Sequence, residues 1–166
     1  LQNAETVLDR RGITGEHREP DVEVVAGSGE TETVHTEHGT RYALDLATVM
    51  FSPGNKRERV RMGEVVAADE RVFDMFAGIG YFTLPMARAG ADVTAAEINP
   101  EAYEFLRENA MRDGVQDRIS AYRADCRAVL TEGLDAFGDA PTVDRIVMGH
   151  YDATDPDGDG GYRYLD

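Results

Sequence analysis

The second half of the chain alternates short apolar runs with longer segments of helical periodicity. The apolar runs that predict strands are Val72–Met75, Asp92–Ile98, Ile119–Ala124 and Val143–Met148. The segments that predict helices between them are Tyr81–Ala89, Pro100–Asp113 and Cys126–Ala136. Strands that alternate with helices in this way predict an α/β fold with a parallel sheet and right-handed crossovers.

The first half of the chain is more polar and carries shorter apolar runs. Three of these runs, separated by glycine turns, predict a small antiparallel β unit: Val22–Ala26, Thr33–His38 and Arg41–Leu46. We interpret Leu1–Arg11 as the tail of a helix and Lys56–Ala67 as a further helix.

These patterns divide the chain into two predicted units. Residues 1–48 read as a partial N-terminal β-containing domain, and residues 49–166 as a Rossmann-like domain. The β unit is too small to bury a good core alone, so we expect it to pack on the second domain. Because a doubly wound sheet of only four strands looks unfinished, we interpret the chain as a fragment that lacks its last strands.

The composition is unusually acidic. The formal net charge is −15, and Lys56 is the only lysine. A dispersed acidic surface that is poor in lysine suits a halophilic protein, which must stay soluble in concentrated salt. Acidity usually argues against a nucleic-acid partner. At molar salt the Debye length falls to about 3 Å, so arginine side chains can still bind RNA locally.

The remaining features of the sequence bear on where in the cell the protein is located. No apolar run is long enough to span a membrane, and no signal peptide is visible. The single cysteine, Cys126, excludes an internal disulfide and fits a reducing interior. We therefore expect a cytoplasmic protein that does not bind a membrane.

The stretch Val72–Thr83 is the centre of the predicted functional site. Gly78 and Gly80 allow a sharp turn and a close approach of the backbone to a ligand. A strand, a glycine turn and a helix in this order are typical of nucleotide sites at the carboxyl edge of a parallel sheet. Thr83 occupies the place of the third glycine in the dinucleotide fingerprint. This weakens the case for NAD and leaves other nucleosides open, with an ordinary strand–turn–helix as the alternative.

Two acidic residues follow the next two predicted strands. Glu97 ends the second strand, where a carboxylate can accept hydrogen bonds from both ribose hydroxyls of a nucleoside. Asp125 ends the third strand, where it can accept the exocyclic amine of an adenine. Because both strand ends meet at one edge of the sheet, the two acids and the glycine turn support a nucleoside site together. A solvated strand end is the alternative for each acid alone.

These residues carry a resemblance to a known family. Asp74–Gly80, Glu97–Pro100 and Asp125–Arg127 resemble motifs of class I S-adenosylmethionine-dependent transferases. More narrowly, Phe51–Asn55 followed by Glu58 and Arg59 is similar to the archaeal Trm5/TYW2 branch, and the likeness extends over roughly residues 12–154. That branch holds tRNA guanine-37 N1-methyltransferases and wyosine-pathway enzymes of the TYW2 (Taw2) type, which transfer the 3-amino-3-carboxypropyl group of S-adenosylmethionine.

The end of the fourth predicted strand separates these two activities. The methyltransferases carry Asn-Pro-Pro or Asn-Leu-Pro there, whereas this chain has Val147-Met148-Gly149-His150. The resemblance therefore implies aminocarboxypropyl transfer to 4-demethylwyosine next to the anticodon of tRNA-Phe. Two alternatives stay open: tRNA guanine-37 N1-methylation, and a non-catalytic fragment that binds cofactor or RNA.

The resemblance also implies roles for single residues. Glu58 would orient or deprotonate the acceptor base, and Arg59 would contact a phosphate or the cofactor carboxylate; a helical surface pair is the alternative for both. His150 and Tyr151 would stack on the flipped base. The residues implied to bind S-adenosylmethionine are Ser52, Asn55, Asp74, Phe76, Ala77, Gly78, Gly80, Tyr81, Phe82, Glu97, Ile98, Asp125, Cys126, Met148 and Gly149.

No metal site is expected. Residues 155–160 match the start of a calcium loop, and Asp166 falls at its twelfth position. Pro156 and the lack of flanking helices argue against calcium there. We interpret His17, His35 and His38, which lack partners at metal-ligand spacing, as surface residues of the β unit.

Overall fold

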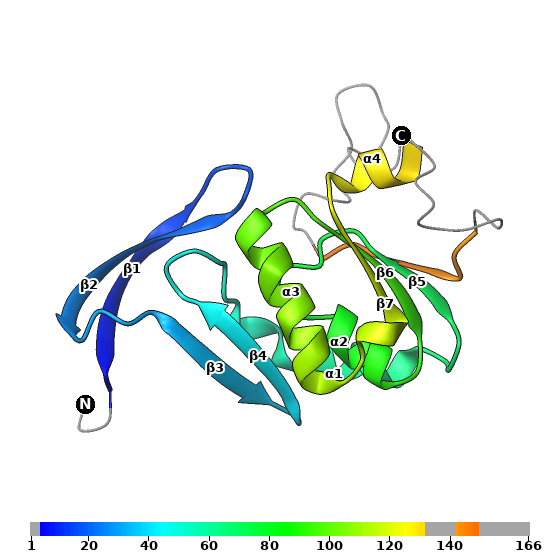
Figure 1. Cartoon of the computed structure of the whole chain (residues 1–166), viewed down its shortest axis with the longest axis horizontal. Coiled ribbons are helices and arrows are strands. Elements are labelled where there is room, and N and C mark those ends of the chain that lie inside the picture. Colours follow the sequence, from blue (N-terminus) through cyan, green and yellow to red (C-terminus); the bar gives the residue numbers. More distant parts are fainter. Residues whose placement is uncertain (1–3, 132–141, 150–166) are drawn as a thin grey trace.

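Two antiparallel hairpins form the first part of the protein (Figure 1). The computed structural model describes residues 4–131 and 142–149. Strands β1 (Thr6–Thr14) and β2 (Glu19–Gly27) form one hairpin, and β3 (Glu32–Glu37) and β4 (Thr40–Asp45) form the other.

The predicted helix tail over Leu1–Arg11 is wrong, because Thr6–Thr14 is a strand. Its backbone groups pair with β2, with Val7 opposite Ala26 and Arg10 opposite Val22. The polar run at residues 9–11 carries no strand pattern of its own, so this strand is set by its partner across the hairpin.

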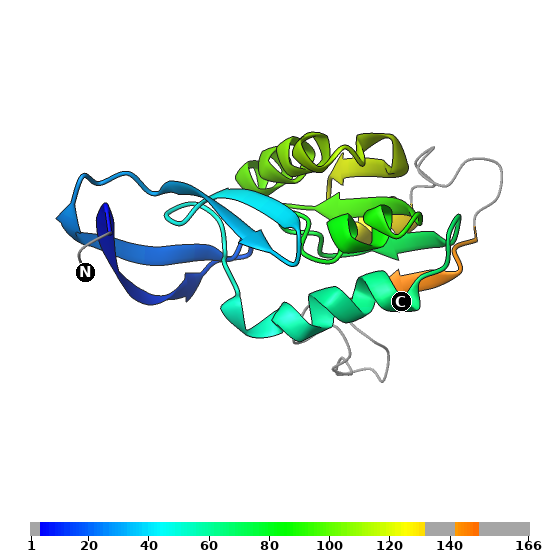
Figure 2. The ribbon, with the colours of Figure 1, turned by 90° about the horizontal axis from the view of Figure 1, so that it is seen from below.

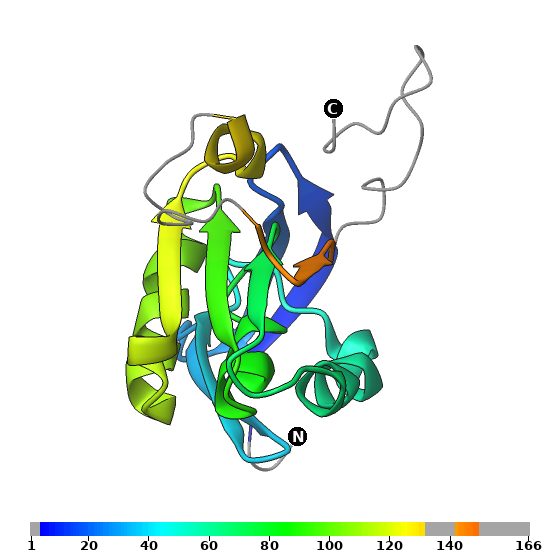
Figure 3. The ribbon, with the colours of Figure 1, turned by 90° about the vertical axis from the view of Figure 1, so that its right-hand side faces the viewer.

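The second part is a parallel sheet with strand order β7-β6-β5-β8, which confirms the predicted α/β fold (Figure 3). Its strands are β5 (Arg71–Asp74), β6 (Asp92–Glu97), β7 (Ile119–Arg123) and β8 (Arg145–Val147). The helices are α1 (Lys56–Val65), α2 (Thr83–Arg88), α3 (Pro100–Asp113) and α4 (Cys126–Thr131). Short 3-10 turns, η1 (Pro53–Asn55) and η2 (Gln116–Arg118), precede α1 and β7.

Helix α3 lies along one face of the sheet (Figure 2), and its ends follow sequence signals. Asn99 caps its first turn: its Oδ1 accepts hydrogen bonds from Glu101 N at 2.9 Å and Ala102 N at 3.2 Å. Pro100 occupies the first turn, and Gly114 ends the helix with a left-handed φ of 69°.

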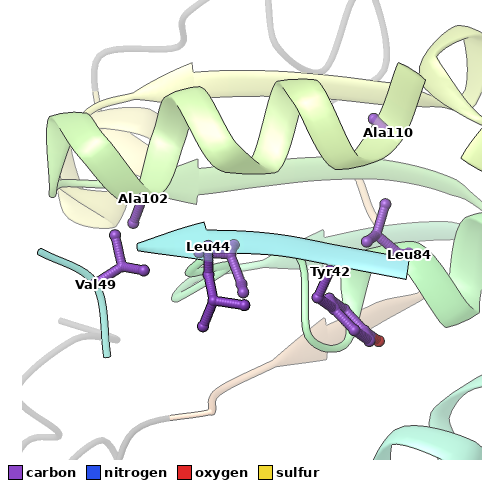
Figure 4. Packing of buried hydrophobic residues seen from close by; sticks show 7 residues of the cluster. Tyr42, Leu44, Val49, Leu84, Ala102 and Ala110 are labelled. Atoms are coloured by element: carbon purple, nitrogen blue, oxygen red, sulfur yellow. The ribbon is translucent and has the colours of Figure 1, made fainter. Parts of the chain in front are cut away.

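The second hairpin packs on this helix and shares its core. Tyr42 and Leu44 of β4 are buried in one cluster with Ala102 and Ala110 of α3 (Figure 4). Asn109, fully buried in α3, donates to the carbonyl of Ala43 at 3.1 Å and accepts from its N–H at 2.7 Å. The backbone N–H and carbonyl of Ala43, at the edge of β4 that no described strand pairs, are thereby satisfied by a side chain of the α/β part.

None of the described helices is long and apolar enough to cross a membrane.

Candidate functional site

The glycine turn after β5 is as tight as the sequence predicts. Gly80 has φ 101°, and a Cβ there would lie 2.8 Å from Cγ of Leu84 and 3.0 Å from Cδ1 of Leu106. Gly78 has φ 56°, and its N–H donates to Oε2 of Glu97 at 2.7 Å. Only glycine fits at position 80 without a shift of the core, whereas Gly78 brings the turn against the acid that ends β6.

The buried side chain of Asp74 holds the glycine turn in place through hydrogen bonds. Its side chain is fully buried and accepts hydrogen bonds from the Thr83 hydroxyl at 2.7 Å and from Phe76 N at 3.4 Å. Burial raises the pKa of Asp74 to about 6, although these hydrogen bonds oppose the rise. The structure thus places Asp74, predicted to bind the cofactor, under the turn and outside the cavity lining; Ala77 and Gly80 lie outside that lining too.

Glu97 lies at the junction of the turn and α3. Its Oε1 accepts from Asn99 N and its Oε2 from Gly78 N, both at 2.7 Å. Burial raises the pKa of Glu97, against the lowering effect of these backbone N–H groups. A carboxylate oxygen can accept more than one hydrogen bond, so Glu97 can also accept from a ribose hydroxyl.

A cavity of about 430 Å³ opens at this edge of the sheet. A volume of this size lies in the range of small-molecule sites. It brings together most of the predicted cofactor residues, from the loop before α1 and the ends of all four parallel strands. Those that line it are Ser52, Asn55, Phe76, Gly78, Tyr81, Phe82, Glu97, Ile98, Asp125, Cys126, Met148 and Gly149.

Arg59 lines the same cavity, although it lies on α1 and its side chain is only 3% exposed. Its guanidinium lies 4.6 Å from the ring centre of Tyr81, donates to the Ser52 carbonyl, and has Nε 3.5 Å from Oε1 of the buried Glu37. In the described part of the chain, its Nη1 is buried without a hydrogen-bond partner. A buried guanidinium N–H at a cavity wall is a ready donor for an anion.

Asp125 and Cys126 form the far wall of the cavity, where β7 passes into α4. Arg127 donates to both carboxylate oxygens of Asp125 and lowers the pKa of that group. Burial raises the pKa of the Cys126 thiol to about 11, so this cysteine is an inert part of the wall at neutral pH.

The structure does not bring Glu58 to the cavity. Its side chain is 42% exposed and pairs with Arg61 one turn further along α1, which lowers the pKa of Glu58. Glu58 thus lies on the helix surface, as the alternative interpretation has it, but its partner is Arg61, whereas Arg59 is buried. His150 and Tyr151, predicted to stack on the acceptor base, lie outside the described residues.

Sequence reasoning missed one wall of the cavity. The tip of the β1–β2 hairpin contributes Ile13, Glu16, His17 and Arg18, and Arg10 follows from β1. Gly15 and Arg18 in this turn have left-handed backbone angles, with φ 70° and φ 57°. The side chain of His17 is 43% exposed, as the sequence predicts, but no pattern within the chain shows that its hairpin reaches this cavity.

The histidines and acids of the described ranges form no group of three that suits a metal ion. The weak calcium-loop match at residues 155–166 lies outside those ranges.

The fold and the cavity define an α/β domain with a cavity of small-molecule size at the carboxyl edge of a parallel sheet. The family model described as "TRM5/TYW2 methyltransferase domain" matches residues 33–156. Because this match covers most of the chain, the protein belongs to the TRM5/TYW2 family, as the sequence motifs predict.

Relatives and solved structures refine this placement. The tRNA(Phe) (4-demethylwyosine(37)-C(7)) aminocarboxypropyltransferase of Pyrococcus horikoshii is 48% identical over 146 residues, which are 87% of this chain and 49% of the relative. P. horikoshii TYW2 in complex with MeSAdo is 47% identical with a TM-score of 0.66, covering 78% of this chain and 46% of that one. M. jannaschii TYW2 in complex with AdoMet is 40% identical with a TM-score of 0.67, covering 78% and 55%. The chain thus spans about half the length of each of these three proteins.

Proposed function

We propose that this protein binds S-adenosylmethionine and transfers its 3-amino-3-carboxypropyl group to C7 of 4-demethylwyosine at position 37 of tRNA-Phe. The proposal agrees with the name of the P. horikoshii relative and with the ligands named for the two TYW2 structures. On this account the protein acts in wyosine biosynthesis, and the anticodon loop of tRNA-Phe is its partner.

The observation that carries the proposal is the charge pattern of the cavity. Glu97 offers carboxylate lone pairs beside the glycine turn, and the buried Nη1 of Arg59 offers a free donor at another wall. S-adenosylmethionine matches this pattern, since its ribose carries hydroxyl donors and its aminocarboxypropyl arm ends in a carboxylate. Asp125 would accept the exocyclic amine of the adenine.

The loop after β8 supports this choice among the family's activities. Met148 and Gly149 line the cavity where the methyltransferases carry an Asn-Pro segment. A Cβ at Gly149 would lie 2.9 Å from Cε2 of Phe82, so the missing side chain leaves space for that ring. In the described residues this part of the wall contains Met148 and Phe82, and neither carries a side-chain amide that could orient a guanine nitrogen for methylation.

The reaction that follows is an in-line displacement. A bond forms between C7 of the base and Cγ of the arm, while the bond from Cγ to sulfur breaks and sulfur keeps the electron pair. Methylthioadenosine leaves, and the C7 proton passes to water. The sulfonium supplies the leaving group, so the protein contributes orientation: it selects the transferred carbon by which one it presents to the base.

Two labelled forms of S-adenosylmethionine test the proposal. One carries radiolabel in the carboxyl carbon and the other in the methyl carbon, and each is incubated with hypomodified tRNA-Phe at high salt. Carboxyl label in the RNA without methyl label is the expected result. Methyl label alone would overturn the proposal and make this protein a tRNA methyltransferase.

A further inference from the structure

Asn99 joins three parts of the molecule through one side chain and its own N–H. Its Oδ1 caps α3, and its backbone N–H donates to Oε1 of Glu97 at 2.7 Å. Its Nδ2 donates to the backbone carbonyl of His17 at 3.0 Å, across 82 residues of sequence. Asn99 is 3% exposed, so its side of the bond to His17 is buried.

The hairpin end that receives this bond forms a wall of the cavity. Residues 15–18 make the turn between β1 and β2, where Arg18 N donates to the Gly15 carbonyl at 3.2 Å. From this end His17 and Arg18 face the cavity, and Figure 1 shows the hairpin end beside the first turn of α3. Arg18 Nη2 also lies 3.8 Å from Sδ of Met50, another residue of the lining.

The bond therefore fastens the hairpin beside the acid that is proposed to hold the ribose. The backbone N–H of Asn99 binds the carboxylate of Glu97, and the side-chain amide of Asn99 binds His17. A movement of Asn99 would therefore affect both contacts. A nucleoside seated against Glu97 lies between the glycine turn and the hairpin end. Loss of the Asn99 side-chain amide would remove the hydrogen bond that holds the end of the β1–β2 hairpin at the nucleoside site.

We propose that Asn99 is a positioning residue that holds the β1–β2 hairpin end against the nucleoside end of the cavity, making residues 15–18 part of the S-adenosylmethionine site. The inference rests on the proposed binding of S-adenosylmethionine. It assigns the hairpin a role in nucleoside binding that no motif in its own sequence indicates.

Two variants of Asn99 separate this role from helix capping. Asn99→Asp keeps the capping oxygen but replaces the donor to His17 by a second oxygen, which repels the carbonyl. Asn99→Ser keeps a capping oxygen without adding charge beside Glu97, so it controls for electrostatic effects. Asn99→Ser should melt closer to the unmodified protein than Asn99→Asp, because both retain a capping oxygen but only the aspartate adds a charge beside the buried Glu97.

The experiment measures the affinity for methylthioadenosine by calorimetry and amide hydrogen exchange at residues 15–18, in all three proteins at high salt. We expect both variants to bind at least about ten-fold more weakly, with faster exchange in the hairpin end. Methylthioadenosine should slow this exchange in the unmodified protein.

Equal affinity in all three proteins, together with unchanged exchange, would overturn the positioning role and leave the proposed function intact. If the unmodified protein binds neither methylthioadenosine nor S-adenosylmethionine, the proposed function fails, and the inference fails with it.

Discussion

The hydroxyl of Thr83 donates a hydrogen bond of 2.7 Å to Oδ2 of the fully buried Asp74. This bond joins the end of β5 to the start of α2 directly beneath the glycine turn. It also explains why threonine fits where a dinucleotide-binding protein would have its third glycine: here the position supports a buried acid. The hydrogen bond lowers the pKa of Asp74, whereas burial raises that pKa more.

The first prediction concerns the pH dependence of stability. Because the pKa of Asp74 is raised from 3.8 to about 6, the folded state binds a proton that the unfolded chain has released. The contribution of Asp74 is therefore most favourable below about pH 4 and declines as the pH rises through about 6. When the pH is lowered from 7.5 to below about 4, the free energy of unfolding of the unmodified protein should rise by about 3 kcal/mol relative to that of Asp74→Asn.

Urea unfolding of both proteins at fixed salt, at several pH values, measures this difference. The comparison removes the effects of groups that the two proteins share. A stability difference that does not change with pH would contradict the raised pKa.

The second prediction concerns packing at the glycine turn. Gly80→Ala should lower the free energy of unfolding by about 2 kcal/mol or more, since its Cβ would overlap Leu84 and the φ of 101° is strained for alanine. Gly12→Ala is the matched control, because nothing lies within 4 Å of the added Cβ and its φ is not left-handed. Denaturant titration measures the free energy of unfolding of both variants. An equal loss in the two variants would argue against a crowded turn at Gly80.

The third prediction concerns Glu97. Glutamine there offers one oxygen and one NH₂ group where the carboxylate accepts N–H groups on both oxygens, so either Gly78 or Asn99 loses its acceptor. Glu97→Gln should weaken methylthioadenosine binding at least about ten-fold.

The pKa shift of Glu97 adds a pH signature to this prediction. Because burial raises its pKa above 4.5, nucleoside affinity should fall on acidification sooner than for an ordinary glutamate. The Glu97→Gln variant should lack this dependence. Calorimetric titrations across pH provide the measurement, and parallel profiles for the two proteins would exclude Glu97 as the responsible group.

The fourth prediction separates the two ends of the ligand. Arg59→Lys keeps a positive charge for the buried Glu37 but loses the planar guanidinium, whose Nη1 is buried without a hydrogen-bond partner in the described part of the chain. S-adenosylmethionine should bind about ten-fold more weakly, whereas methylthioadenosine, which lacks the carboxylate, should bind within about two-fold of normal. Equal losses for both ligands would mean that Arg59 acts on folding or on the nucleoside and not on the carboxylate.

Much of the α/β part could be predicted from sequence because its signals are local. The strands of the parallel sheet are short apolar runs, and Asn99, Pro100 and Gly114 specify the ends of α3 through their own backbone preferences. Positions at the carboxyl edge of a parallel sheet converge by topology, so the sequence alone predicts that Glu97 and Asp125 lie at one site.

The features that the sequence did not reveal depend on distant partners. Thr6–Thr14 is a strand because β2 pairs with it, and its polar residues look unstructured when read alone. Arg59 occupies an ordinary position of a polar helix, yet it is buried because Glu37, Tyr81 and the Ser52 carbonyl surround its guanidinium. Such placements are decided by tertiary contacts and leave no periodic signal.

The most direct test of the central claim identifies the nucleoside released from S-adenosylmethionine. The protein is incubated with S-adenosylmethionine and hypomodified tRNA-Phe at high salt. The released nucleosides are then separated by chromatography and identified by mass spectrometry. Transfer of the aminocarboxypropyl group predicts methylthioadenosine, formed only when the tRNA is present and in equal amount to the modified base. Release of S-adenosylhomocysteine in its place would contradict the account, because it would show that the methyl carbon had been transferred.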